Sequence, residues 1–221
     1  MHPILHDIRL VAFDLDGTLI DSVPELAVAV DMTLSELGLP EAGERKARLW
    51  VGNGALKLVE RALADALGEA PSPQRLEPAH QRFLYHYGRD VGARTRLYPG
   101  VRECLDALRE RGLSLALVTN KPHAFIAPLL EGVGLDAHFA LCLGGDSLPD
   151  KKPHPAPLLH VAAHFDVSPA ACLMVGDSRH DVAAGKAAGF RTLAVPYGYN
   201  HGEPVRDSGP DGVVESLAEL V

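Results

Sequence analysis

Apolar residues fall into short runs that end in glycine, aspartate, asparagine or proline. Five such runs predict strands, and most are apolar throughout, as is typical of strands covered on both faces. They are residues 8–14, 113–120, 139–146, 171–177 and 191–196. Helical periodicity occupies much of the sequence between them, over 101–111, 123–133, 155–165 and 179–188. Alternating strands and helices predict an α/β fold with a doubly wound parallel sheet.

The interval from residue 21 to about residue 96 breaks this alternation because it contains no convincing strand. Helical patterns cover 24–37, 54–67 and 75–88, with glycine and proline between them. A connection of this length is no simple loop, so we expect an all-helical domain inserted after the first strand. The expected division is 1–20 and 97–221 for the α/β core and 21–96 for the insertion. After Tyr199 we expect a loop and a short final helix.

Composition narrows the range of partners. The chain of 221 residues carries a net charge of −8, and this argues against nucleic acid or an anionic membrane as the main partner. Three widely spaced cysteines without a CxxC pair predict no disulfide framework and suit a reducing cytoplasm. No signal peptide or apolar run of transmembrane length is recognisable. We expect a cytoplasmic protein that is a monomer or a weak homodimer.

Polar residues of unusual character gather just beyond four of the predicted strands. They are Asp14 and Asp16, Thr119 and Asn120, Lys152, and finally Asp177, Ser178 and Asp181. Ligands of open α/β sheets bind beyond the carboxyl ends of the strands, so we expect these groups to converge at one edge. Side chains two residues apart in an extended segment point the same way, so Asp14 and Asp16 are expected to face one ligand.

The charge of this collection indicates its chemistry. Several carboxylates in one place require a cation, and an all-oxygen site suits Mg²⁺ better than zinc. With a metal and a lysine nearby, a carboxylate stays ionised and can act as a nucleophile. A hydroxyl, a lysine ammonium and backbone N–H groups suit the oxygens of a phosphoryl group. These residues therefore suggest phosphoryl transfer through an aspartyl-phosphate.

Four segments in order resemble the motifs of the haloacid dehalogenase superfamily. They read VAFDLDGTL, LVTN, KKPHP and VGDSRHD, and they extend over the whole predicted core. The resemblance implies a Rossmann-like core with the helical insertion as a cap. It also implies that Asp14 is the nucleophile, that Asp16 is the general acid and base, and that Lys152 neutralises the phosphate. Thr119 and Asn120 would bind the phosphate oxygens.

The same resemblance implies a magnesium site and a specificity element. Asp14, Asp177 and the backbone carbonyl of Asp16 would bind Mg²⁺, while Ser178 and Asp181 would support the metal shell. Caps rather than cores set substrate choice in this superfamily, so the glycine-rich cap segment Gly52, Asn53 and Gly54 is expected to face the substrate.

Longer segments resemble one group within the superfamily, the bacterial phosphoglycolate phosphatases. These segments are VGNGALKLVERAL in the insertion, and LVTNKPHAFIAPLLE, GGDSLPDKKPHPAPLL and YGYNHGE in the core. The resemblance implies hydrolysis of 2-phosphoglycolate, a small phosphorylated organic acid, with Mg²⁺ as cofactor.

Four other functions share parts of the pattern, and two of them are disfavoured. A phosphatase for another small ester, such as a sugar or amino-sugar phosphate, would share the core motifs. A sugar phosphomutase would share Asp14 and Asp16, but it must shield its phosphorylated intermediate from water. A phospho-accepting receiver domain is disfavoured because it lacks a helical insertion, and a dehalogenase because it has no use for an acid at Asp16.

Overall fold

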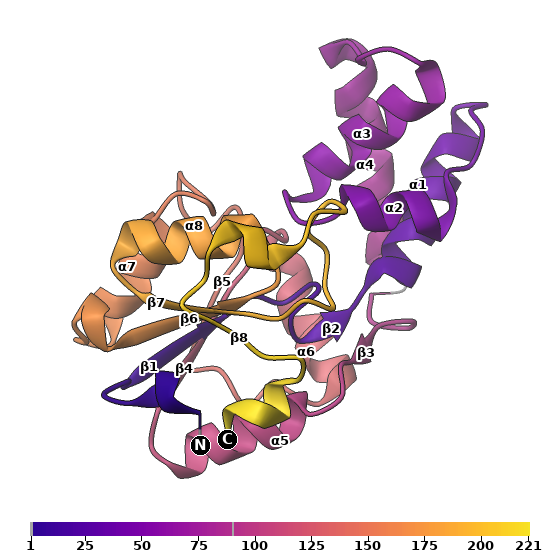
Figure 1. The fold of residues 1–221 in the computed structure, drawn as a ribbon. Helices are drawn as coiled ribbons and strands as arrows, with labels where there is room; N and C mark the ends of the chain where they lie inside the picture. Colours follow the sequence, from indigo (N-terminus) through magenta and orange to yellow (C-terminus); the bar gives the residue numbers. More distant parts are fainter. Residues whose placement is uncertain (1, 90) are drawn as a thin grey trace.

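The computed structural model describes residues 2–89 and 91–221, and in this part of the chain six strands form one parallel sheet (Figure 1). The strands are β1 (Leu10–Phe13), β4 (Ser114–Val118), β5 (Leu141–Leu143), β6 (Cys172–Gly176), β7 (Arg191–Ala194) and β8 (Gly212–Val213). Their order across the sheet is β5-β4-β1-β6-β7-β8. The chain therefore winds outward from β1 in both directions. The switch in direction falls between β1 and β6, where ligands of such sheets bind.

Helices cover both faces of this sheet. The helices α5 (Val101–Glu110) and α6 (Ile126–Val133) lie on one side, and α7 (Ala156–His164) and α8 (Arg179–Ala188) on the other (Figure 1). In β1, Val11 and Phe13 pack in the buried cluster that contains α5 and α6, whereas Leu10 and Ala12 pack in the cluster that contains α7 and α8. An apolar run is needed where both faces are buried. The predicted doubly wound fold is confirmed.

Four helices between β2 and β3 form a separate body at one end of the sheet (Figure 1). They are α1 (Val23–Glu36), α2 (Gly43–Trp50), α3 (Ala55–Leu67) and α4 (Pro73–Arg89), and they share an apolar cluster of their own. The helix α2 was not predicted. Half of its sequence GERKARLW is charged and only Ala47 is buried, so it offers too short an apolar stripe to be recognised.

Two short strands join this helical segment, which we call the cap, to the sheet domain. The strand β2 (Ile20–Asp21) pairs antiparallel with β3 (Arg96–Leu97), with Ile20 opposite Leu97. Neither strand was predicted, because two residues are too few to show a period. The expected domain boundaries at 20/21 and 96/97 fall inside this ladder, and that division remains a prediction.

Several shorter elements also differ from the expectations. The predicted helix over 123–133 begins as a 3₁₀ turn before α6, and the predicted final helix is a 3₁₀ turn followed only by Val221. The 3₁₀ turns are Pro3–Leu5, His123–Phe125, Pro169–Ala171, Val205–Ser208 and Leu217–Leu220. The strand β8 was expected to be loop, since Gly212 and Val213 carry almost no pattern. No helix among the described residues is both long and apolar enough to cross a bilayer.

Candidate functional site

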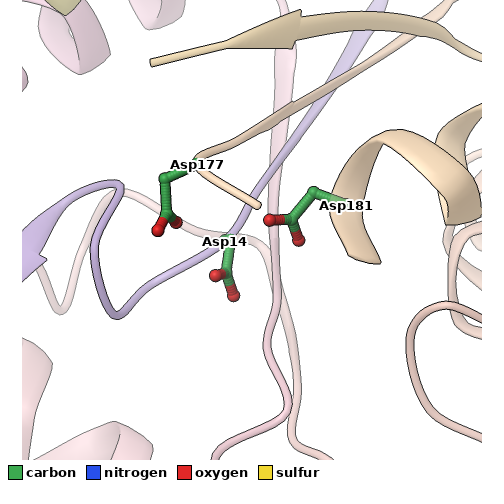
Figure 2. Close-up of side chains that lie close together, drawn as sticks. All are labelled: Asp14, Asp177 and Asp181. Carbon is green, nitrogen blue, oxygen red and sulfur yellow. The ribbon is translucent and has the colours of Figure 1, made fainter. Parts of the chain in front are cut away.

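Three aspartates meet at the switch point of the sheet. Asp14 follows β1 directly, Asp177 follows the neighbouring strand β6, and Asp181 lies in the first turn of α8. Each offers a carboxylate oxygen within 4.8 Å of the other two, and Figure 2 shows the three side chains grouped close together. The parallel pairing of β1 with β6 produces this proximity, because the two strands end side by side.

A buried lysine lies against this cluster. Lys152 Nζ is 2.7 Å from Asp14 Oδ1 and 2.6 Å from Asp181 Oδ1, and its side chain is 2% exposed. The neighbouring Lys151 is exposed and donates instead to the carbonyl of Asn53 in the cap, at 3.1 Å. Of the two lysines in the KKP segment, only Lys152 therefore lies beside the predicted nucleophile.

Asp177 is fixed by two donors from different loops. Thr18 Oγ1 donates to its Oδ1 at 2.7 Å, and the backbone N–H of Tyr199 donates to its Oδ2 at 2.6 Å. The Asp14–Asp16 loop approaches so closely that a Cβ on Gly17 would lie 2.3 Å from Asp177 Oδ2. Gly17 also has a φ of +91°, a conformation that favours glycine.

Asp181 is held by the N-terminus of its own helix and by Lys152. The backbone N–H and the hydroxyl of Ser178 donate to its Oδ2 at 3.0 and 2.6 Å, completing a capping box, while Lys152 Nζ donates to Oδ1. Gly176 permits this approach, since a Cβ there would lie 2.3 Å from the Asp181 Cβ. Both oxygens of Asp181 thus already have donors.

The cluster carries more negative than positive charge. Three buried carboxylates face one ammonium, and this leaves two negative charges uncompensated. Burial raises the pKa of Asp14 to about 7, with Lys152 opposing the rise, and burial also raises the pKa of Asp177 well above its ordinary value. Asp14 Oδ1 is buried against the Lys152 ammonium. All-oxygen donors and a charge deficit of two fit a hard divalent cation.

The Asp16 carboxylate lines the same pocket as Asp14 but pairs with a second lysine. Lys121 Nζ lies 3.0 and 3.1 Å from the two carboxylate oxygens of Asp16, and Ser22 Oγ donates to Oδ1 at 2.5 Å. The Lys121 side chain is buried. Lys121 was not among the predicted site residues, although it follows Asn120 directly after β4. Its position at the end of this strand could have identified it as a residue of the sheet edge.

Thr119 and Asn120 lie between the two lysines. Thr119 Oγ1 accepts from the backbone N–H of Lys121 at 3.2 Å. Asn120 Nδ2 donates to the carbonyl of Lys152 at 3.0 Å and to that of Gly52 in the cap at 3.2 Å. Asn120 therefore joins two sheet-edge loops to the cap.

The cap segment Gly52–Gly54 contacts the site in two ways. Gly52 and Gly54 line the pocket beside the aspartates, whereas Asn53 is not among the lining residues. Asn53 Nδ2 instead meets His180 Nε2 at 2.6 Å, and Asn53 Oδ1 accepts from Arg61 at 2.7 Å. Asn53 thus bridges the cap and the N-terminus of α8, and its part in specificity remains a prediction.

The pocket lies between the sheet edge and the cap, with a polar and an apolar side. Its polar side is formed by Asp14, Asp16, Thr119, Asn120 and Lys121. Its apolar side includes Leu26, Val51, Leu58, Phe83, Tyr87 and Phe125. Such a pocket favours a small charged ligand over one with many hydroxyl groups, because each hydroxyl against the apolar wall would lose its hydrogen bonds to water.

The pocket lies at the switch point of a doubly wound sheet, beneath helices inserted after the first strand. This arrangement places the protein among capped α/β hydrolases. One family of that class, the haloacid dehalogenase-like hydrolases, has a model that matches residues 8–189. The chain belongs to this family.

Relatives resemble the chain over nearly its whole length. A phosphoglycolate phosphatase of Nitrosococcus oceani is 46% identical, with 96% of this chain and 94% of the relative covered. One of Escherichia coli K12 is 45% identical, with 97% and 92% covered. The crystal structure of a protein described as a predicted phosphoglycolate phosphatase, from Haemophilus somnus 129pt, superposes with a TM-score of 0.92 at 38% identity and covers 97% of this chain and 96% of its own.

The burial of His180, which contacts Asn53, predicts that the stability of the protein depends on pH. Burial lowers the pKa of His180 from 6.5 to about 4, so the folded protein keeps the imidazole neutral. Below pH 6.5 the unfolded chain takes up a proton that the folded chain refuses, and stability falls until about pH 4. Relative to His180→Gln, the wild type should lose about 1 kcal/mol more between pH 7.5 and pH 5, allowing for partial exposure. Urea unfolding of both proteins at the two pH values measures the difference. Equal losses would contradict it.

Proposed function

We propose that the protein is a Mg²⁺-dependent phosphatase that hydrolyses 2-phosphoglycolate to glycolate and phosphate. The observation that carries this proposal is the 46% identity to the Nitrosococcus oceani phosphatase over 96% of the chain, because that likeness includes the cap. A shared core alone would indicate only the family chemistry. The small pocket with one apolar side supports a compact anionic substrate.

The proposed cation would be held by Asp14, Asp177 and the backbone carbonyl of Asp16. When bound, Mg²⁺ supplies positive charge that offsets the carboxylates and the phosphoryl oxygens. Asp181 would support this site indirectly, by holding Lys152 and Ser178 in place, since its two oxygens accept from these residues.

Asp14 is the proposed nucleophile. One of its oxygens attacks phosphorus, a new oxygen–phosphorus bond forms, and the bond from phosphorus to the ester oxygen breaks. Lys152 lies 2.7 Å from Asp14 Oδ1, so its ammonium orients the attacking carboxylate and opposes charge on the phosphoryl oxygens. Thr119 and the backbone of Asn120 supply further phosphate contacts at the same edge.

Asp16 is the proposed proton carrier. It would donate a proton to the departing glycolate oxygen and later accept one from the water that hydrolyses the aspartyl-phosphate. In the structure Ser22 and Lys121 both donate to its carboxylate. These contacts fix the orientation of the Asp16 carboxylate beside the pocket.

The cap segment Gly52–Gly54 is proposed to limit substrate size. Gly52 and Gly54 bring backbone to the pocket wall, and Asn53 fixes that segment to His180. The three cysteines, Cys104, Cys142 and Cys172, form no disulfide, and this supports the proposed cytoplasmic location. A monomer or weak homodimer remains our expectation.

The substrate proposal predicts a ranking of kcat/KM. The purified protein with Mg²⁺ should hydrolyse 2-phosphoglycolate at least about 10-fold more efficiently than hexose phosphates, phospholactate or N-acetylmuramate 6-phosphate, because larger groups would press against the apolar wall. Phosphate release from each ester measures the ranking. A preference for a sugar phosphate would identify another phosphatase of the family, and conversion of a sugar phosphate to its isomer would identify a mutase.

Replacing the nucleophile tests the covalent step. Asp14→Asn should lower kcat by about 10⁴-fold or more, because an uncharged amide replaces the attacking oxygen. The fold should survive, since the change removes a carboxylate whose charged form is opposed by burial. Steady-state phosphate release and circular dichroism measure the two properties. Substantial activity in a folded variant would remove Asp14 from this role.

Chelation tests the cation. EDTA should reduce turnover of 2-phosphoglycolate to background, and added Mg²⁺ should restore it, because two negative charges of the aspartate cluster otherwise repel the phosphate. Zn²⁺ should restore activity poorly, since the proposed donors are all oxygen. Unchanged turnover after exhaustive chelation would show that the aspartates work without a metal.

A further inference from the structure

Lys121 has no role in the reaction steps described above. Lys121 is 6% exposed, and its ammonium lies between the Asp16 carboxylate and the ring face of Tyr87, 4.7 Å from the ring centroid. Among the described residues that line the pocket, Lys121 is the only cation. The pocket therefore concentrates its positive charge at one point, directly beside the proposed proton carrier.

Two donors at this point can take a further acceptor. The Lys121 ammonium has three N–H groups, and the side-chain acceptors that it reaches within the described chain are the two carboxylate oxygens of Asp16. The Tyr87 hydroxyl is buried and has no hydrogen-bond partner among the residues described. Burial raises the pKa of Tyr87, so this hydroxyl keeps its proton and remains a donor. Unmatched buried donors of this kind are rare and indicate a missing acceptor.

The geometry points to a carboxylate subsite formed by Lys121 and Tyr87, which binds the carboxylate of the substrate and sets the preference for 2-phosphoglycolate. This inference rests on the function proposed above. In 2-phosphoglycolate a single methylene separates the ester oxygen from the carboxylate carbon. The group that protonates the ester oxygen and the group that binds the carboxylate must therefore be neighbours. Asp16 and Lys121 are in direct contact.

The same arrangement explains how short and long substrates are distinguished. A carboxylate one methylene from the ester oxygen reaches Lys121, whereas a longer or neutral chain would extend toward Leu58 and Phe83 on the apolar wall. An ammonium in a site largely closed to water recognises an anion more strongly than an exposed one does. Specificity then comes from one charge at one distance rather than from many hydrogen bonds.

Two substrates that differ only at the carboxylate test this subsite. The kcat/KM for 2-phosphoglycolate is divided by that for 2-hydroxyethyl phosphate, in which a neutral hydroxymethyl group replaces the carboxylate. Lys121→Met should lower this ratio by about 100-fold, and Tyr87→Phe by about 10-fold. Lys46→Met removes a lysine from an exposed ion pair with Asp65 in the cap and should leave the ratio unchanged.

The outcomes separate this inference from the proposed function. If wild type does not prefer 2-phosphoglycolate over 2-hydroxyethyl phosphate, the proposed function is wrong. If wild type has the preference and Lys121→Met keeps it, with both substrates slowed equally, Lys121 only positions Asp16 and the subsite is wrong. If Lys121→Met does not fold, Lys121→Gln takes its place, because it keeps a donor to Asp16 without the charge. An undiminished ratio in Lys121→Gln likewise overturns the subsite.

Discussion

Mutual repulsion among buried carboxylates is the constraint around which this molecule is arranged. At separations of at most 4.8 Å, each pair of charged carboxylates costs at least about 3 kcal/mol at the effective dielectric typical of proteins. Burial adds to that cost, as the raised pKa of Asp14 and of Asp177 shows. The surrounding structure offsets it with donors: Lys152, the start of α8, the Thr18 hydroxyl and the Tyr199 backbone. Binding of a divalent cation would offset the negative charge that remains.

The sheet edge and the cap form the two sides of the pocket, and they differ in chemical character. The sheet edge presents charge in two separate pairs, Lys152 with Asp14 and Lys121 with Asp16. The cap presents apolar side chains and the backbone of Gly52 and Gly54. A charged edge alone would bind many phosphate esters, and an apolar cover alone would bind none. In the proposed function, a substrate is selected when it pairs with both lysines and places no polar atoms against the apolar cover.

The sequence predicted most of the sheet domain because its signals are local. Apolar runs ending in polar residues located β1 and β6 closely, and the residues that follow them supplied Asp14 and Asp177. Helix α2 was missed because half of its residues are charged. The ladder of β2 with β3 was missed because its strands have too few residues to show a period.

Contacts between distant segments set the limit of prediction at the site. Lys121 meets Asp16 across 105 residues, and Asn53 meets His180 across 127. The place of Lys121 after β4 puts it at the sheet edge, but the sequence does not predict its partner, because strand order brings Asp16 to it. Lys152 could be chosen over Lys151 only through the family resemblance, and the structure shows the physical difference in their burial.

The pairing of β2 with β3 has a consequence for how this protein can change. Ile20 and Leu97 lie opposite each other in this ladder, so the cap leaves and rejoins the sheet domain at one place. The β2–β3 pairing holds the two ends of the cap together. A change within the cap therefore does not require the sheet to move. Helices of the cap could be lengthened, shortened or exchanged while β1 and β6 stay in register. A lineage could therefore acquire new substrates by remodelling one continuous insert, with the reacting aspartates inherited intact.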